Sequence, residues 1–141
     1  MICNRETARQ KIVQAIENLR ATAPVPNVIV EFEGKTQVNV STATEPYVKV
    51  WIDYIDGMQI GLGTNTGDRA MGSIIIEARQ RQGSGMGTIN NLLTHFYKTI
   101  HRSDDLFPVR TRSARHASPP PLDGWVRVGV AIPFWWDNLV G

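Results

Sequence analysis

Hydrophobic residues recur at helical spacing in two segments of the chain. From Asn4 to about Ala21 they form one stripe, Asn4 or Thr7 can cap the helix, and the first proline that follows stops it. The segment from Thr88 to His101 has the same period. Both patterns predict amphipathic helices that bury one face. The stripe residues are Ala8, Ile12, Ala15, Ile16 and Leu19 in the first segment and Ile89, Leu92, Leu93, Phe96, Tyr97 and Ile100 in the second.

Other segments alternate between apolar and polar positions, as half-buried strands do. Val48, Val50, Ile52 and Tyr54 can line one face of a strand from Tyr47 to Ile55, and the β-branched run from Ser73 to Arg79 can pair with it. A last strand places Val126, Val128, Val130, Ile132 and Phe134 on one face, and Pro133 and the tryptophans after it mark its end. Shorter extended segments are expected at Val28–Phe32, Gln37–Val40, Leu106–Val109 and Thr111–Ser118.

Between the two central strands, residues Asp56 to Gly72 hold five glycines and a polar tip. That composition is too flexible for a core and the segment is too long for a tight turn, so it predicts a long loop on a rigid hairpin. Such a loop is an interaction arm or a disordered excursion, and the sequence leaves both interpretations open. The tip residues that an arm would use are Gly61, Thr64, Asn65 and Thr66.

The order of elements predicts an α+β fold, with two helices on one face of a mostly antiparallel sheet and a long β-hairpin arm. The face without helices carries Trp51, Glu77, Arg79 and Arg127, and Trp125 is a further candidate. This mixture of aromatic and charged groups indicates a solvated surface or a docking surface for a partner.

Trp135 and Trp136 stand together at the predicted end of the last strand. Tryptophan is enriched at protein interfaces, so the pair is a candidate anchor, and the alternative is that one of the two plugs the end of the core. Both interpretations remain open at this point.

Composition limits the function classes. A chain of 141 residues makes one domain, 1–141, and 42% hydrophobic and 20% charged residues exclude a wholly disordered chain. A net charge of +2 does not by itself indicate nucleic acid. The single cysteine, Cys3, suits a reducing cytoplasm, and no apolar run resembles a signal peptide or a membrane span.

Candidate chemistry is sparse. The glycine-rich segment Gly83–Gly87 lacks the Gly-Lys-Ser/Thr ending of a phosphate loop, and His95 and His101 fall on different faces of their helix. No serine or cysteine stands in a nucleophile elbow. We therefore expect no catalytic, metal or cofactor site and no enzymatic activity.

The run from Arg110 to His116 carries alternate basic residues, which on a strand would line one face and follow phosphates. It contains no aromatic residue that could stack on a base. A solvated or intersubunit salt-bridging face is therefore the favoured interpretation, and a small nucleic-acid-binding module is the alternative.

Several sequence segments together resemble the tail-terminator-like (tail completion) proteins of long-tailed bacteriophages. These are the strand Pro-Tyr-Val-Lys-Val, a glycine-rich loop closing on Asp-Arg-Ala-Met-Gly-Ser-Ile-Ile-Ile-Glu, the step Gly-Ser-Gly-Met-Gly into a helix, and a terminal Gly-Trp-Val-Arg-Val-Gly-Val-Ala-Ile-Pro-Phe-Trp-Trp-Asp. The resemblance covers nearly the whole chain. The basic segment from Arg110 to Pro121 and the double tryptophan depart from the family pattern.

The resemblance implies a structural virion protein that assembles in the host cytoplasm and lies in the neck region of the tail. Its copies would form a ring, a homohexamer, that caps the tail tube, ends tube polymerisation and joins the head-side connector. Its partners would be other copies of itself, the tube protein and the connector, with genomic DNA only passing through the lumen and no membrane. The alternative within the virion is another neck or tail-completion subunit.

Overall fold

The computed structural model describes residues 3–33, 38, 43–60, 67–83 and 85–138, without the side chains of 56–60, 67 and 138. The elements are α1 (Arg5–Arg20), β1 (Ile29–Phe32), β2 (Tyr47–Ile60), β3 (Gly67–Arg81), α2 (Gly87–Tyr97), β4 (Arg110–Thr111), β5 (Arg115–Ala117) and β6 (Trp125–Asn138). They form an α+β fold whose six-stranded sheet has the order β1-β2-β3-β6-β4, with β5 also paired to β6. Among the described strands only the β1–β2 pair is parallel, so the predicted fold class is confirmed.

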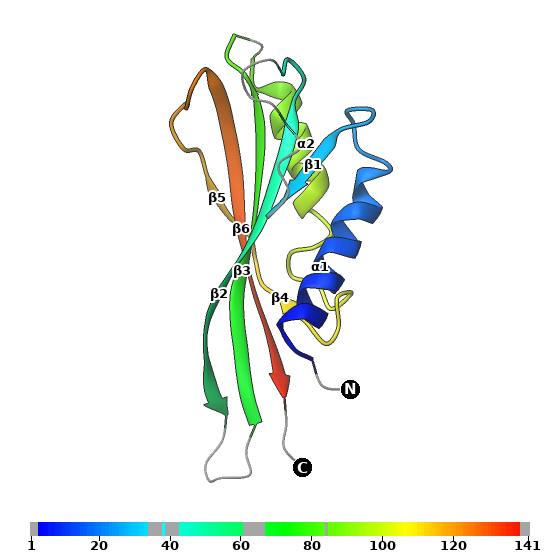
Figure 1. Ribbon diagram of the computed structural model, residues 1–141, viewed down its shortest axis with the longest axis vertical. Helices are drawn as coiled ribbons and strands as arrows, with labels where there is room; N and C mark the ends of the chain where they lie inside the picture. Colours follow the sequence, from blue (N-terminus) through cyan, green and yellow to red (C-terminus); the bar gives the residue numbers. More distant parts are fainter. Residues whose placement is uncertain (1–2, 34–37, 39–42, 61–66, 84, 139–141) are drawn as a thin grey trace.

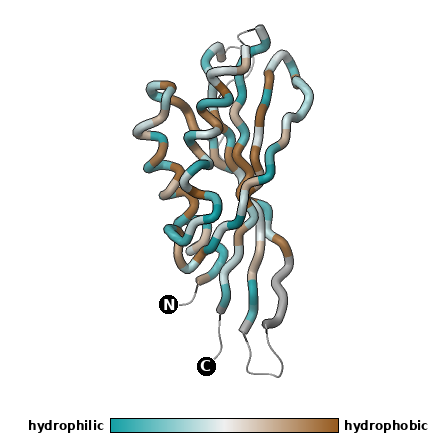
Figure 2. The backbone as a smooth tube through the Cα atoms, turned by 180° about the vertical axis from the view of Figure 1, so that it is seen from behind, coloured by the Kyte–Doolittle hydropathy of each residue, from teal (hydrophilic) through white to brown (hydrophobic). Residues whose placement is uncertain are grey.

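Both helices cover the same face of the sheet (Figure 1). The alternating residues predicted for β2 and β6 point towards them, and the core between the layers includes the fully buried side chains of Ile12, Ile16, Leu92 and Phe96. In Figure 2 the hydrophobic segments gather where the helices meet the sheet. The two predicted amphipathic stripes therefore build the core.

Local signals explain where α1 begins. Asn4 is its N-cap, because the Asn4 Oδ1 accepts a 2.8 Å hydrogen bond from the Thr7 backbone N–H. Glu6 lies in the first turn and pairs with Arg9 at 2.6 Å. Helix α2 ends at Tyr97 and continues only as turns to Arg102, which is shorter than the helical pattern predicted.

The prediction of a long loop at Asp56–Gly72 is largely wrong, because β2 runs to Ile60 and β3 begins at Gly67. β3 pairs with β6 on its other side as well, and these two ladders carry the strand through its glycines. A register shift between Ile55 and Met58 absorbs the irregularity in β2. The strands β2, β3 and β6 project beyond the helices at one end of the molecule (Figure 1).

Strand β6 also continues through Pro133, where the sequence pattern predicted its end. The Pro133 carbonyl accepts a 2.9 Å hydrogen bond from the Arg112 N–H, so the ring nitrogen of Pro133 points away from β3 as well. The missing N–H then costs no bond in the β3–β6 ladder. The Pro133 ring nitrogen faces the gap between β4 and β5, which pair with β6 on either side of Pro133.

The segment before β6 is less regular than predicted. Leu106–Val109 forms turns, and the expected strand Thr111–Ser118 is split into β4 and β5. The predicted turn at Asp123–Gly124 is confirmed: their φ angles are 51° and 80°, and Leu122 pairs with Trp125 across them. Of the expected strand at Gln37–Val40, only Val38 is among the residues described.

Candidate interaction surface

The register of the sheet brings the predicted surface residues together on the face without helices. Trp51 lies opposite Ile75, which lies opposite Ala131 on β6. Glu77 occupies the next row towards the β1 end of β2, and Arg79 pairs with Arg127 in the row after that. The prediction that Trp51, Glu77, Arg79 and Arg127 share one face is confirmed.

One end of this face is covered. Trp125 is 3% exposed and forms a small second core with Tyr47 and Val38, where the Tyr47 and Trp125 rings meet edge to face at 5.2 Å. The Arg81 guanidinium lies 4.7 Å from the centre of the Trp125 ring, and its Nε donates to the Ala43 carbonyl. Trp125 is therefore a core residue rather than part of an exposed face.

The charged residues at the centre of the face are paired within the chain. Glu77 is only 6% exposed, and its Oε1 accepts a 2.6 Å hydrogen bond from Arg79 Nε, with Arg127 Nη1 at 3.9 Å. Burial lowers the pKa of the Arg79 guanidinium, but a hydrogen bond to the Tyr47 hydroxyl and the attraction of Glu77 outweigh it and raise that pKa. Arg127 also donates to the Pro120 carbonyl. This cluster stabilises the sheet and offers a partner few unmet charges.

Four apolar residues, Trp51, Ile55, Met71 and Ile75, form what we name the apolar strip of the helix-free face. Ile55 is opposite Met71, and the Asp53–Ser73 pair separates them from Trp51 and Ile75. Ile55 is 55% exposed and the other three are partly exposed. The strip borders an open edge of the sheet, because β1 pairs with β2 only at Tyr47–Val50 and no other described strand pairs with that side.

Trp135 lies between two arginines. The Arg112 guanidinium is 4.7 Å from the ring centre of Trp135 and that of Arg69 is 5.8 Å away. Arg69 also forms a two-pronged salt bridge with Asp137, at 2.7 and 2.9 Å. The hydrogen bond from Arg69 is the main reason why the pKa of the Asp137 carboxyl is lowered. Trp135 is partly exposed, so it remains a candidate contact residue.

Trp136 points to the opposite side of β6 and is 3% exposed. Its ring stacks on Phe134 with centres 6.0 Å apart, and its Nε1–H donates to the Cys3 carbonyl at 3.0 Å. Its assignment as an interaction residue is therefore corrected, and the alternative that one tryptophan plugs the core holds for Trp136. Burial is also the main reason why the pKa of the Cys3 thiol is raised.

The predicted arm-tip residues Gly61, Thr64, Asn65 and Thr66 lie outside the described residues. Ile55, Met71 and Ile75 were missed as surface residues. The glycines of 56–72 hid the strand alternation at Met71, whereas Ile55 and Ile75 lay within the predicted strands but were not assigned to the helix-free face. The basic residues Arg110, Arg112 and Arg115 were considered separately from this face. Only the register of β4 and β5 against β6 places these arginines beside the helix-free face.

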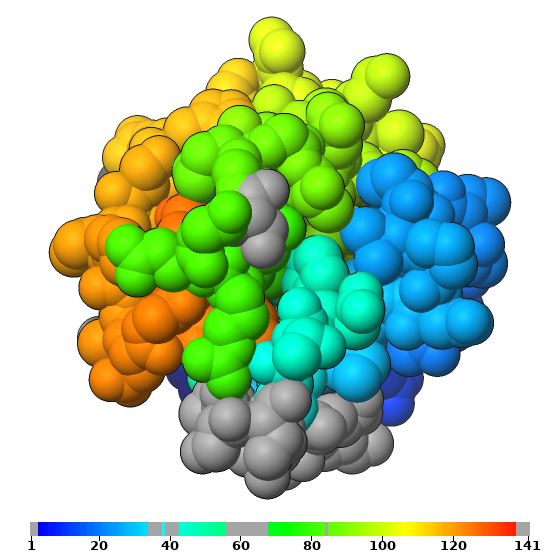
Figure 3. Space-filling model, turned by 90° about the horizontal axis from the view of Figure 1, so that it is seen from above, coloured from blue at the N-terminus to red at the C-terminus, as the bar shows by residue number. Residues whose placement is uncertain are grey.

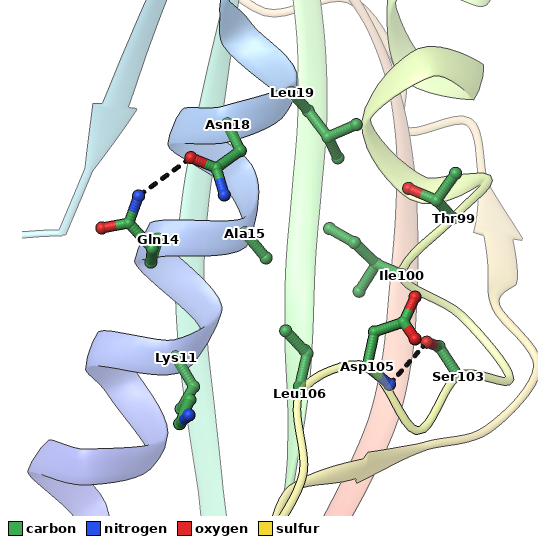
Figure 4. A pocket seen from close by; sticks show the side chains of 10 residues that line it. All are labelled: Lys11, Gln14, Ala15, Asn18, Leu19, Thr99, Ile100, Ser103, Asp105 and Leu106. Atoms are coloured by element: carbon green, nitrogen blue, oxygen red, sulfur yellow. Dashed lines mark hydrogen bonds between the residues drawn. The ribbon is translucent and has the colours of Figure 1, made fainter.

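A pocket with a volume of about 390 Å³ lies between α1 and the turns that follow α2 (Figure 4). Its side chains form an apolar floor with a polar rim, where Gln14 donates to Asn18 at 2.9 Å. Lys11 and Asp105 are its ionisable lining residues, a pair that provides no nucleophile with an adjacent base. The lining residues are Lys11, Gln14, Ala15, Asn18, Leu19, Thr99, Ile100, Ser103, Asp105 and Leu106.

The histidines take part in packing contacts. His95 Nε2 lies 2.7 Å from the Leu19 carbonyl, and His101 Nδ1 accepts a 3.2 Å hydrogen bond from the Ala114 N–H. His116 meets the Tyr97 ring edge to face. Among the described residues, no group of three or more His, Cys, Asp or Glu could hold a metal ion. No helix in the same part of the chain is long and apolar enough to cross a membrane.

Comparison with known proteins supports the fold and adds no function. No protein-family model matches the chain, and no curated protein is significantly similar to it. A solved structure, known only by a sequence identifier, matches with a TM-score of 0.65 at 12% identity and covers 99% of both chains. At this identity the similarity concerns the fold alone, over the whole length of the domain.

Proposed function

We propose that this protein is a tail-terminator-like subunit, whose copies close into a hexameric ring that caps a phage tail tube and joins it to the head-side connector. The open edge of β2 beside the apolar strip carries the proposal. The resemblance of the sequence segments to tail-terminator-like proteins supports it independently.

The open edge requires a physical explanation. From Trp51 to Ile60, no strand among the described residues pairs with the outer edge of β2, which leaves backbone N–H and C=O groups open over roughly 30 Å at about 3.4 Å per residue. Long open edges promote uncontrolled association unless something covers them. A neighbouring copy that adds a strand or a loop at this edge would satisfy those groups.

The apolar strip beside that edge supplies the second part of an interface. Ile55 is 55% exposed, with Met71 next to it across the hairpin. An interface that combines a few apolar anchors with backbone pairing, and buries at least about 1,000 Å² in total, holds a stable oligomer. Contact between two different patches on each copy closes into a ring when the rotation allows it.

The projecting strands suit the contact with the tube. β2, β3 and β6 extend past the helices as a three-stranded ribbon, and the Arg69–Asp137 salt bridge joins two of its strands. A ribbon that is rigid at its base can direct its tip towards the tube protein while the body contacts its neighbours. This arrangement applies equally to another neck or tail-completion subunit, which differs only in the partners that it contacts.

The test compares Ile55→Lys with Leu122→Lys, since both residues are large, apolar and about half exposed, at 55% and 51%. Mass photometry of the parent protein, alone and with tail tubes, should show one discrete oligomer. Ile55→Lys should dissociate it, and Leu122→Lys should leave it intact. Addition of the parent to polymerising tube protein should narrow the distribution of tube lengths.

A parent protein that is monomeric both alone and on tubes would overturn the ring. A discrete oligomer that Ile55→Lys leaves intact would place the interface elsewhere. An oligomer with no effect on tube length would favour the other neck subunit over the terminator.

A further inference from the structure

Charge is distributed unevenly between the two sides of the sheet. In the whole chain, 15 basic residues nearly balance 13 acidic ones. Among the described residues, the strand register places twice as many basic as acidic residues on the helix-free face. The basic residues are Lys49, Arg69, Arg79, Arg81, Arg110, Arg112, Arg115 and Arg127, and the acidic ones are Glu31, Asp53, Glu77 and Asp137.

Most of the acidic groups on this face are already held by cations. Glu31 lies 3.9 Å from Lys49, Glu77 lies 2.6 Å from Arg79, and both oxygens of Asp137 bind Arg69. The remaining positive charge on this face therefore lies on basic residues other than Lys49, Arg69 and Arg79. Paired charges produce little net field beyond their neighbours.

Arg110, Arg112 and Arg115, which we name the basic edge, are all exposed and form no salt bridge within the described part of the chain. β4 and β5 hold Arg110 and Arg115 against β6, on the side of the sheet away from β1. Arg112 lies between them and stacks over the partly exposed ring of Trp135. The basic edge is separated from the apolar strip of β2 and β3 by β6.

We propose that the basic edge binds the phosphate backbone of duplex DNA without sequence selectivity. All three cations are arginines, whose planar guanidinium forks bind phosphate oxygens bidentately. The described residues place no helix or ribbon there that could enter a groove, so phosphate contacts alone are expected. The biological role of this DNA binding rests on the proposed function. In the proposed ring, the apolar strip would join the subunits and the basic edge would face the lumen through which DNA passes.

The test uses a fluorescein-labelled duplex of about 20 base pairs with arbitrary sequence, followed by anisotropy from 50 to 200 mM NaCl. Three phosphate contacts give a slope of about −2.7 in the plot of log affinity against log salt, a loss of roughly 40-fold over this range. The triple variant Arg110→Ser, Arg112→Ser, Arg115→Ser should lose that slope.

The matched control removes the same three charges from α1, as Arg5→Ser, Arg9→Ser, Arg20→Ser. Figure 3 shows α1 (blue) and the segment leading into β6 (orange) on opposite flanks of the molecule. The control should keep the salt slope of the parent. Circular dichroism of both variants should show parental helix and strand content, which separates lost binding from lost folding.

Absence of binding at 50 mM NaCl, or an equal loss of slope in the control, would overturn the proposal. Tighter binding of polyglutamate than of DNA at equal charge concentration would overturn it as well and would indicate an acidic protein partner. Mass photometry of the same variants keeps the two proposals distinct. Rings that fail to bind DNA refute only the basic edge, whereas monomers that bind DNA through these arginines refute only the ring.

Discussion

Replacement of Gly72 by alanine tests whether β3 is a strand throughout or a flexible loop at its start. Gly72 lies between Asp53–Tyr54 of β2 and Phe134 of β6. A Cβ added there would overlap the Asp53 carbonyl oxygen and lie 2.6 Å from the Phe134 Cζ. Both contacts are far shorter than normal van der Waals separations, and one is to the backbone of β2, which its pairing with β3 holds in place.

The magnitude follows from two opposing effects. Relief of such overlap in a packed core costs about 1–3 kcal/mol, since Phe134 is 2% exposed and also stacks on Trp136. Alanine restricts the unfolded chain, which by itself would stabilise the protein by about 0.4–1 kcal/mol. The steric cost is the larger of the two, so Gly72→Ala should lower the free energy of unfolding by about 1–2 kcal/mol.

Gly87→Ala is the matched control, because Gly87 begins α2 and an added Cβ would meet nothing within 4 Å. It should raise the free energy of unfolding by about 0.4–1 kcal/mol. Urea denaturation followed by circular dichroism measures both changes. If Gly72→Ala stabilises the protein as Gly87→Ala does, the close packing of β2, β3 and β6 at this point is wrong.

Two further predictions concern the core and pH. Phe96→Ala should cost about 3–5 kcal/mol in urea denaturation, because Phe96 is fully buried on α2, and a change under about 1 kcal/mol would contradict its burial. Burial, with Arg102 and His116 nearby, lowers the pKa of His101, whose Nδ1 accepts the Ala114 N–H. The unfolded chain then takes up a proton first, so stability should be complete above pH 6.5 and fall as pH drops from there to the folded-state pKa. His101→Asn, which keeps an acceptor but does not titrate, should reduce this fall, and an unchanged profile would refute the assignment.

Local sequence patterns correctly predicted the elements that depend on residues close by in the sequence. Asn4 caps α1 through its own side chain, and the 3.6-residue period of α2 reports directly which face is buried. The alternation of β6 likewise predicted its inward residues. The pattern failed at Pro133 and across 56–72, because local propensity there is overruled by pairing with strands distant in the sequence.

The same division holds for the surface. The sequence by itself determined the α+β class, the helix-free face and the group of Trp51, Glu77, Arg79 and Arg127 on it, since alternation along a strand decides which side chains share a side. Only the tertiary structure decided that Trp136 is buried while Trp135 is partly exposed between arginines. It also decided which charges are neutralised and which edge stays open, because both depend on contacts between segments that are far apart in the chain.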